Sequence, residues 1–239
     1  MPFLRSTLIA SLGLMACASP ALKDRVAVLE SQVAELQAAE AEPSPAETPA
    51  EREEQATLLL LQAQEAVQEQ RFDDARATVA RLLEDYGDTR AGVAARRAAG
   101  PLEILGREAG ELEVDFWFQG EATMDDGDLT LLVFWEWWCP HCKRSMPELQ
   151  QTWETWGPQG LNLVALTKVT RSATDDLVHA YLEEEGLTYP VAKEIDQSMT
   201  HRFQVTGVPA AAIVQDGTIL WRGHPSELDD RMFAAWLTE

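Results

Sequence analysis

The chain has 239 residues, with 40 acidic side chains against 19 Lys and Arg, and a formal net charge of −21. This charge excludes an electropositive nucleic-acid interface and docking on anionic lipid through basic side chains, so no nucleic-acid partner is expected. The length allows one domain with extensions or two small domains, and 46% hydrophobic residues supply a core. Three cysteines are too few for a disulfide-stapled mini-domain or a zinc site made of four cysteines.

The chain opens with MPFLRSTLIASLGLMAC, which has the layout of a secretory signal peptide. Arg5 supplies the positive start, and the apolar stretch that follows is too short to span a membrane. The closing LMAC resembles a bacterial lipobox, in which the cysteine becomes the lipidated first residue of the mature chain. The resemblance implies a signal peptide over residues 1–16, lipid attachment at Cys17, and an outer membrane location in preference to the inner one. Ordinary cleavage beside Cys17, leaving a free thiol, is the alternative.

Residues 17–40 are expected to form a lipid-anchored helical stalk. Leucines and valines there each recur every seven residues, a pattern that favours two-stranded coiled coils, at Leu22, Val26, Leu29, Val33 and Leu36. The pattern lasts less than three heptads, so a single amphipathic helix and a dimer through the stalk both remain open. Residues 41–50 contain three prolines and predict an extended linker.

Residues 51–110 are rich in Ala, Leu, Glu, Gln and Arg and predict a helical segment. Helices are expected over 55–70, 72–86 and 89–105, the last broken near Gly100-Pro101. The stretch RFDDARATVARLLEDYGDTRAGVAA resembles a tetratricopeptide repeat. Only about one and a half repeats fit, fewer than such repeats need to bury a core. The segment is therefore expected to be a helical hairpin docked on a neighbour, as a spacer or as a partner-binding module.

Residues 111–239 alternate strand and helix patterns, which predicts an α/β domain with a mixed sheet covered on both faces. Continuous apolar runs at 129–135 and 161–167 indicate buried central strands. The other expected strands are 113–119, 189–192, 210–214 and 219–222, the last two joined by an Asp-Gly turn. The expected helices are 140–156, 174–185, 197–203 and 226–237, with Ser226 as the N-cap of the last.

The chemistry is concentrated in Trp138-Cys139-Pro140-His141-Cys142, at the end of a predicted strand and the start of a predicted helix. In this context a CxxC sequence indicates a redox dithiol. Cys139 would lie at the helix N-terminus, where free N–H groups favour its thiolate, and Cys142 would be the buried resolving thiol. Pro140 suits the first helical turn, and His141 adds a donor or positive charge that stabilises the reduced form and raises the reduction potential.

Other interpretations of the two cysteines are weaker. A zinc site would need two further ligands, so no metal is expected. Haem attachment needs CxxCH, but Lys143 follows Cys142. A structural disulfide closing so short a loop would give little stabilisation through chain entropy. The expected redox group is the Cys139–Cys142 disulfide itself, with no separate cofactor.

From about residue 111 to 239 the chain resembles the TlpA/ResA-like thiol–disulfide oxidoreductases of the thioredoxin superfamily. The resemblance rests on VFWEWWCPHCKRSMPEL, with its tryptophan before the first cysteine, and on VTGVP at 205–209. It implies a thioredoxin fold, a cis peptide bond before Pro209, and a substrate backbone held beside the cysteines by Val208 and Pro209. Trp138 is placed at the rim of the active site.

The sequence departs from the family at its acidic positions. Val133 stands in place of thioredoxin's buried aspartate, and Ser145 stands where some TlpA-like reductases have a glutamate. The nearest acid is Glu136, for which a solvated loop residue is favoured over a proton relay.

The sequence therefore predicts an exported, lipid-anchored thiol–disulfide oxidoreductase on the periplasmic side of a bacterial cell envelope. Its partners would be protein thiols or disulfides of the envelope, and a redox partner that recharges the dithiol. The alternative is a non-catalytic adaptor that binds envelope partners. A peroxidase is less favoured, because the chain has no PxxxTxxC motif around a single cysteine.

Overall fold

The computed structural model describes residues 25–26, 28–33 and 47–237. The chain divides into two compact units, Met1–Thr48 and Pro49–Glu239. Within the described residues, no helix combines the length and apolar character that crossing a membrane requires. The expected signal peptide, Cys17 and most of the linker lie outside the described residues.

In the first unit, the described residues 25–26 and 28–33 are helical, as expected for the stalk. Leu29 and Val33 are exposed there. The single helix and the two-stranded coil therefore both stay predictions.

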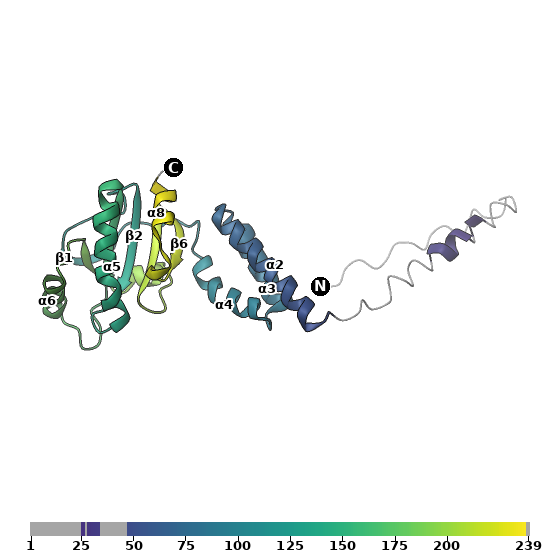
Figure 1. Cartoon of the computed structure of the whole chain (residues 1–239), viewed down its shortest axis with the longest axis horizontal. Helices are drawn as coiled ribbons and strands as arrows, with labels where there is room; N and C mark the ends of the chain where they lie inside the picture. The colour runs from purple at the N-terminus through teal and green to yellow at the C-terminus, as the bar shows by residue number, and fades with distance from the viewer. Residues whose placement is uncertain (1–24, 27, 34–46, 238–239) are drawn as a thin grey trace. The chain divides into compact units, whose positions relative to one another are not determined.

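The second unit begins with three helices, α2 (Pro49–Gln68), α3 (Phe72–Tyr86) and α4 (Arg90–Leu102) (Figure 1). Each buries one stripe of apolar residues, and those of α2 and α4 are mostly alanine or glycine, which allows the helices to pack closely. The tightest approach is at Gly92, where an added Cβ would lie 2.3 Å from the backbone oxygen of Tyr86. The helical segment expected over 51–110 is therefore present, although α2 already begins at Pro49, inside the expected linker.

The rest of the chain forms one six-stranded sheet in the order β1-β4-β3-β2-β5-β6. The strands are β1 (Val114–Gln119), β2 (Leu129–Trp135), β3 (Leu161–Thr167), β4 (Val191–Glu194), β5 (Ala210–Gln215) and β6 (Thr218–Gly223). The central strands β2, β3 and β4 run parallel, and the other neighbours pair antiparallel. Every residue of β2 and β3 is buried, in agreement with their continuous apolar runs.

Helices cover both faces of this sheet. The helices are α5 (Pro140–Trp156), α6 (Asp175–Glu185), α7 (Ser198–Arg202) and α8 (Asp230–Leu237), and Figure 1 shows α5 lying along the sheet. On one face, Trp135 contacts Tyr181 of α6, with ring centroids 5.7 Å apart. On the other face, the preceding residue Phe134 contacts Phe203, just after α7, at 5.6 Å. The predicted mixed sheet with two covered faces is confirmed.

The helical segment docks on the edge strand β6 through the connection between α4 and β1. The backbone N–H groups of Gly106 and Ala109 donate to the carbonyl oxygens of Ile219 and Gly217, both at 2.8 Å. Phe72 of α3 packs on Gly106, whose φ is +77° and whose Cα approaches the ring so closely that an added Cβ would lie 2.5 Å from it. The docked hairpin expected from the sequence is therefore found on β6.

Three predicted element boundaries were wrong for identifiable reasons. The last helix does not start at Ser226, because 225–227 form a 3₁₀ turn and the carboxylate of Asp229 instead accepts the first helical N–H groups of α8. Strand β4 begins after Pro190 because proline cannot donate to the strand ladder. Helix α4 is not broken at Gly100-Pro101, because Pro101 lies in its last turn, where Glu103 N–H still reaches Ala99 O at 3.2 Å.

Candidate functional site

The two cysteines lie where β2 gives way to α5, as predicted. Cys139 has extended backbone and is the N-cap of α5, and its Sγ accepts the backbone N–H of Cys142 at 3.2 Å. Pro140 is the first helical residue, where its missing N–H costs nothing. The helix start therefore holds the first sulfur against a backbone N–H donor, at the positive end of the helix dipole.

The environment distinguishes the two thiols. Both are free thiols in this structure, and Cys142 is fully buried whereas Cys139 retains 4% exposure. Burial raises the pKa of the Cys142 thiol well above its usual value, and its hydrogen bond with Cys139 raises it further. At neutral pH, Cys142 is therefore the protonated partner, which suits a resolving thiol.

The segment before β5 lies beside the first cysteine. Phe134, near the end of β2, pairs with Ala210 at the start of β5, so the residues just beyond these strand ends are neighbours. The Val208–Pro209 peptide bond is cis, as the resemblance implied. The Cys139 thiol donates to the carbonyl oxygen of Val208 at 3.6 Å.

His141 is exposed between the cysteines, and its Nδ1 lies 2.7 Å from an Nη atom of Arg144. A guanidinium can only donate hydrogen bonds, so Nδ1 accepts here. Arg144 brings a positive charge close to the start of α5. The sequence predicted a donor or positive charge from His141, whereas the contribution of Arg144 was not predicted.

Glu136 differs from the solvated loop residue that was favoured from the sequence. It is 1% exposed, and its Oε2 accepts the backbone N–H of Thr170 at 3.2 Å. Its Oε1 is buried and has no partner among the described residues. Its backbone oxygen accepts the N–H of Cys139 at 3.0 Å. One residue therefore fixes both the first cysteine and the loop after β3, with a carboxylate held in the protein interior.

That loop, residues 168–174, supplies site residues that the sequence analysis missed. Trp138 donates from Nε1 to the Thr170 hydroxyl at 3.1 Å. The guanidinium of Arg171 lies 3.7 Å from the centre of the Trp138 ring. A cation–π contact therefore stabilises the position of the Trp138 ring. Since β2 and β3 are parallel neighbours, their carboxyl ends share one edge of the sheet, and this was the signal available in the sequence.

The burial of the Cys142 thiol predicts how the free energy of unfolding depends on pH. In the folded chain the pKa of Cys142 is raised, whereas in the unfolded chain it titrates near about 8.5. The reduced protein should therefore keep full stability below about pH 8.5 and lose up to about 1.4 kcal/mol per pH unit above it. Urea unfolding of the reduced protein at several pH values measures this slope. Cys142→Ser should flatten it up to about pH 10, above which Tyr181 and Tyr189, whose pKa values are also raised by burial, contribute.

Unchanged stability of the reduced wild-type protein between pH 7.5 and 10 would contradict the assigned burial of Cys142.

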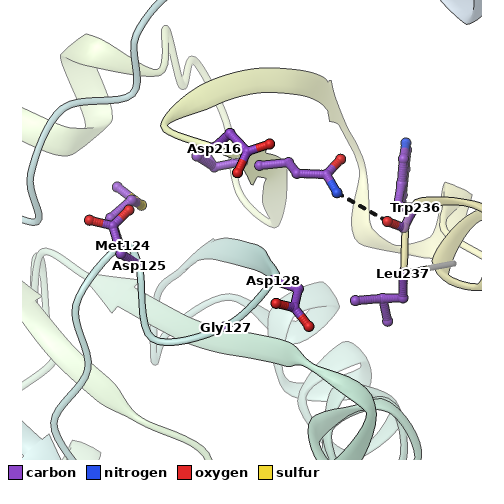
Figure 2. Close-up of a pocket in the computed structure, with 9 residues that line it drawn as sticks. Met124, Asp125, Gly127, Asp128, Asp216, Trp236 and Leu237 are labelled. Atoms are coloured by element: carbon purple, nitrogen blue, oxygen red, sulfur yellow. Dashed lines mark hydrogen bonds between the residues drawn. The ribbon is translucent and has the colours of Figure 1, made fainter. Parts of the chain in front are cut away.

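A separate pocket of about 560 Å³ lies at the other end of β2, beside its first residues. Figure 2 shows the carboxylates of Asp125, Asp128 and Asp216 around it, with Gln215 Nε2 donating to the backbone oxygen of Trp236 at 3.1 Å. Among the described residues, no three His, Cys, Asp or Glu side chains gather closely enough to hold a metal ion. The candidate site is the dithiol and its rim, where Cys139, Cys142 and Glu136 lie close together.

Comparison with known sequences agrees with this geometry. Residues 119–222 match the model of the AhpC/TSA family. The chain is 22% identical over 90 residues to sporulation thiol-disulfide oxidoreductase A of Bacillus subtilis, covering 38% of this chain and 54% of that protein. It is 26% identical over 90 residues to thiol-disulfide oxidoreductase ResA of Oceanobacillus iheyensis, covering 38% and 45%. The chain thus spans about half the length of these curated relatives.

Comparison with solved structures identifies the fold. The solution structure of a thioredoxin-like protein in its oxidized form superposes with a TM-score of 0.50 and 22% sequence identity. The superposition covers 56% of this chain and 96% of that structure. The predicted thioredoxin fold and the predicted resemblance to ResA-like proteins are both confirmed.

Proposed function

We propose that the protein is a thiol–disulfide oxidoreductase of envelope proteins, because residues 119–222 match the model of the AhpC/TSA family within a thioredoxin fold. The observation that carries the proposal is the dithiol itself. Cys139 caps a helix beside the Val208 carbonyl, and a second thiol, Cys142, is buried one turn further along. No separate cofactor is needed, because the Cys139–Cys142 pair carries the two electrons.

The proposed reaction is a two-step thiol–disulfide exchange. The Cys139 thiolate attacks one sulfur of a partner disulfide, forming a mixed disulfide and releasing the partner's other sulfur as a thiolate. Cys142 then loses its proton and attacks the Cys139 sulfur, which forms the Cys139–Cys142 disulfide and releases the second partner thiolate. Two electrons pass from the dithiol to the partner. A separate redox partner recharges the dithiol by the reverse exchange.

The Cys142 proton needs an acceptor, and Glu136 is proposed as the proton relay. Val133 and Ser145, at the family's acidic positions, carry no carboxylate. The carboxylate of Glu136 is buried on the residue whose backbone holds Cys139, and one of its oxygens is free of protein partners among the described residues. A buried base of this kind contributes to proton transfer without changing the nucleophile.

Glu136→Gln is expected to slow the resolution of the mixed disulfide by roughly tenfold or more near neutral pH, with less effect at alkaline pH. The amide can still accept the Thr170 N–H, so the loop should remain in place. Stopped-flow kinetics across pH measures the step, and Glu148→Gln on the exposed side of α5 is the matched control. Identical pH profiles of the resolution rate for the wild type and Glu136→Gln would contradict the proposed relay role of Glu136.

The dithiol is also proposed to be more oxidising than that of thioredoxin. The N-terminus of α5 and the nearby Arg144 both favour a thiolate at Cys139. Stabilising the reduced form raises the reduction potential above the value of about −270 mV that thioredoxin has. The direction of electron flow is then decided by the partner that recharges the site.

The location proposed for this chemistry is the periplasmic side of the cell envelope, with the chain anchored by lipid at Cys17. The support is the sequence LMAC after a short apolar stretch. The outer membrane is favoured over the inner one, and the stalk and helical segment would hold the thioredoxin-like domain away from the lipid.

One experiment tests both the function and the location. In bacterial envelopes, Cys142→Ser should accumulate mixed disulfides through Cys139, because the resolving thiol is absent. These adducts should fractionate with membranes, and a reductant should cleave them back to the separate proteins. Adding Cys17→Ser should move them to the soluble fraction. Absence of reductant-sensitive adducts would contradict the exchange function, and unchanged membrane association of the Cys17→Ser chain would contradict the anchor.

A further inference from the structure

A groove of about 520 Å³ lies between helix α4 and the segment that leads to Pro209. We call it the α4 groove. Among the residues that line it are Arg96, Arg97, Thr206, Gly207, Pro209 and Glu227. It exists because the helical segment docks on β6, so one wall comes from outside the thioredoxin-like domain.

The groove adjoins the dithiol through the cis Val208–Pro209 segment. Pro209 lines the groove, and the preceding carbonyl group, that of Val208, accepts the hydrogen bond from the Cys139 thiol. The backbone N–H groups of Thr206, Gly207 and Val208 donate no hydrogen bond to any other described residue. Thr206 and Gly207 are exposed. A polypeptide bound at Cys139 could therefore continue in extended form along this segment and enter the groove, pairing through its backbone.

The α4 wall of the groove is basic. Arg96 and Arg97 are both exposed on α4. Arg96 donates to the backbone oxygen of Gly87 at 3.1 Å, and Arg97 has no hydrogen bond or ion pair with a described residue. A single carboxylate, Glu227, is among the described residues that line the groove. In a chain with a net charge of −21, this pair of arginines is a local attraction for a negatively charged partner.

The other side of the dithiol is basic as well. Arg171 lies on Trp138, and Arg144 lies beside His141. Basic side chains thus lie on three elements near the dithiol, which are α4, α5 and the loop after β3, whereas the chain as a whole is acidic. This charge distribution favours acidic residues close to the partner's cysteine and not elsewhere on the partner.

We infer that the α4 groove binds an extended, acidic segment of the partner polypeptide next to its reacting cysteine. This inference rests on the proposed oxidoreductase function and specifies its substrate class. It also gives the helical segment a binding role, in which Arg97 is a specificity-determining residue.

The test uses the full chain in its reduced form and peptides that carry one cysteine as a mixed disulfide with 2-mercaptoethanol. One peptide has glutamates on both sides of the cysteine, and the other has glutamines. In the reaction, the dithiol gives two electrons to the mixed disulfide, which leaves the protein disulfide, the peptide thiol and 2-mercaptoethanol. Hydroxyethyl disulfide, a neutral small substrate, reports on the dithiol alone.

The wild type should prefer the glutamate peptide by about three- to fivefold in kcat/KM at low salt, as expected for exposed ion pairs, and lose this preference in high salt. Arg97→Glu should abolish or reverse the preference, and Arg97→Gln should reduce it. Arg81→Glu on α3 changes the net charge equally outside the groove and should leave the preference intact. All variants should reduce hydroxyethyl disulfide at the wild-type rate.

Equal turnover of the two peptides by the wild type would overturn the inference, as would an Arg97→Glu preference equal to that of Arg81→Glu. Failure of the wild type to reduce hydroxyethyl disulfide would instead refute the proposed oxidoreductase function. The two failures are therefore distinguishable.

Discussion

Replacing Cys139 by alanine is expected to lower the rate of insulin reduction by roughly a thousandfold or more, to the uncatalysed background. Cys139 is the sulfur at the helix start, with 4% exposure and a contact to Val208, whereas Cys142 is fully buried. No other described cysteine can replace it as the nucleophile. The measurement is insulin precipitation in the presence of dithiothreitol.

Cys139→Ser and the wild type provide the comparison, because serine keeps the N-cap interaction with Cys142 N–H and therefore the helix start. Cys139→Ser should be as inactive as Cys139→Ala while remaining as stable as the wild type in its reduced form. Equal activity of Cys139→Ala and the wild type would contradict the proposed enzymatic function and favour the non-catalytic adaptor.

Phe72→Ala is expected to destabilise the chain by about 3–5 kcal/mol, in the range of large-to-small changes at buried aromatic positions. Phe72 is 8% exposed and its ring packs on Gly106, in the connection that pairs with β6. Loss of the ring should release the helical segment from the edge strand before the sheet unfolds. Chemical unfolding measures the free energy, and amide hydrogen exchange at Gly106 and Ala109 reports the docking directly.

The control for this change is Val93→Ala, an aliphatic truncation at an exposed position of α4, which should alter stability by less than about 0.5 kcal/mol. A cost below about 1 kcal/mol for Phe72→Ala, with unchanged exchange at Gly106, would contradict the described docking. Undocking should also remove one wall of the α4 groove and, with it, the preference for acidic peptides.

The sequence predicted the elements around the dithiol well, because they have strong local signals. The bounds of β2, β3 and α5 agree with the structure, since continuous apolar runs and a proline at the first helical position define them. The start of α8 was missed because both Ser226 and Asp229 have side chains suited to helix capping, and only the 3₁₀ turn decides between them.

The environment of the dithiol could not be predicted in full, because it depends on distant segments. An acid after a buried strand is usually solvated, and Glu136 is buried because the loop at Thr170 folds over it. The contact of Arg171 with Trp138 crosses between neighbouring strands. The basic wall at Arg97 appears only when α4 docks beside Pro209.

A redox titration of the purified protein against glutathione buffers tests the central claim most directly. Alkylation of free thiols followed by mass spectrometry gives the fraction of the protein in which Cys139 and Cys142 are both thiols and the fraction in which they form a disulfide. The account predicts one two-electron transition between dithiol and disulfide, at a potential less negative than about −270 mV. Cysteines that remain independently reduced across the series, with no disulfide between them, would contradict the redox function; a transition at or below about −270 mV would contradict the proposed oxidising character.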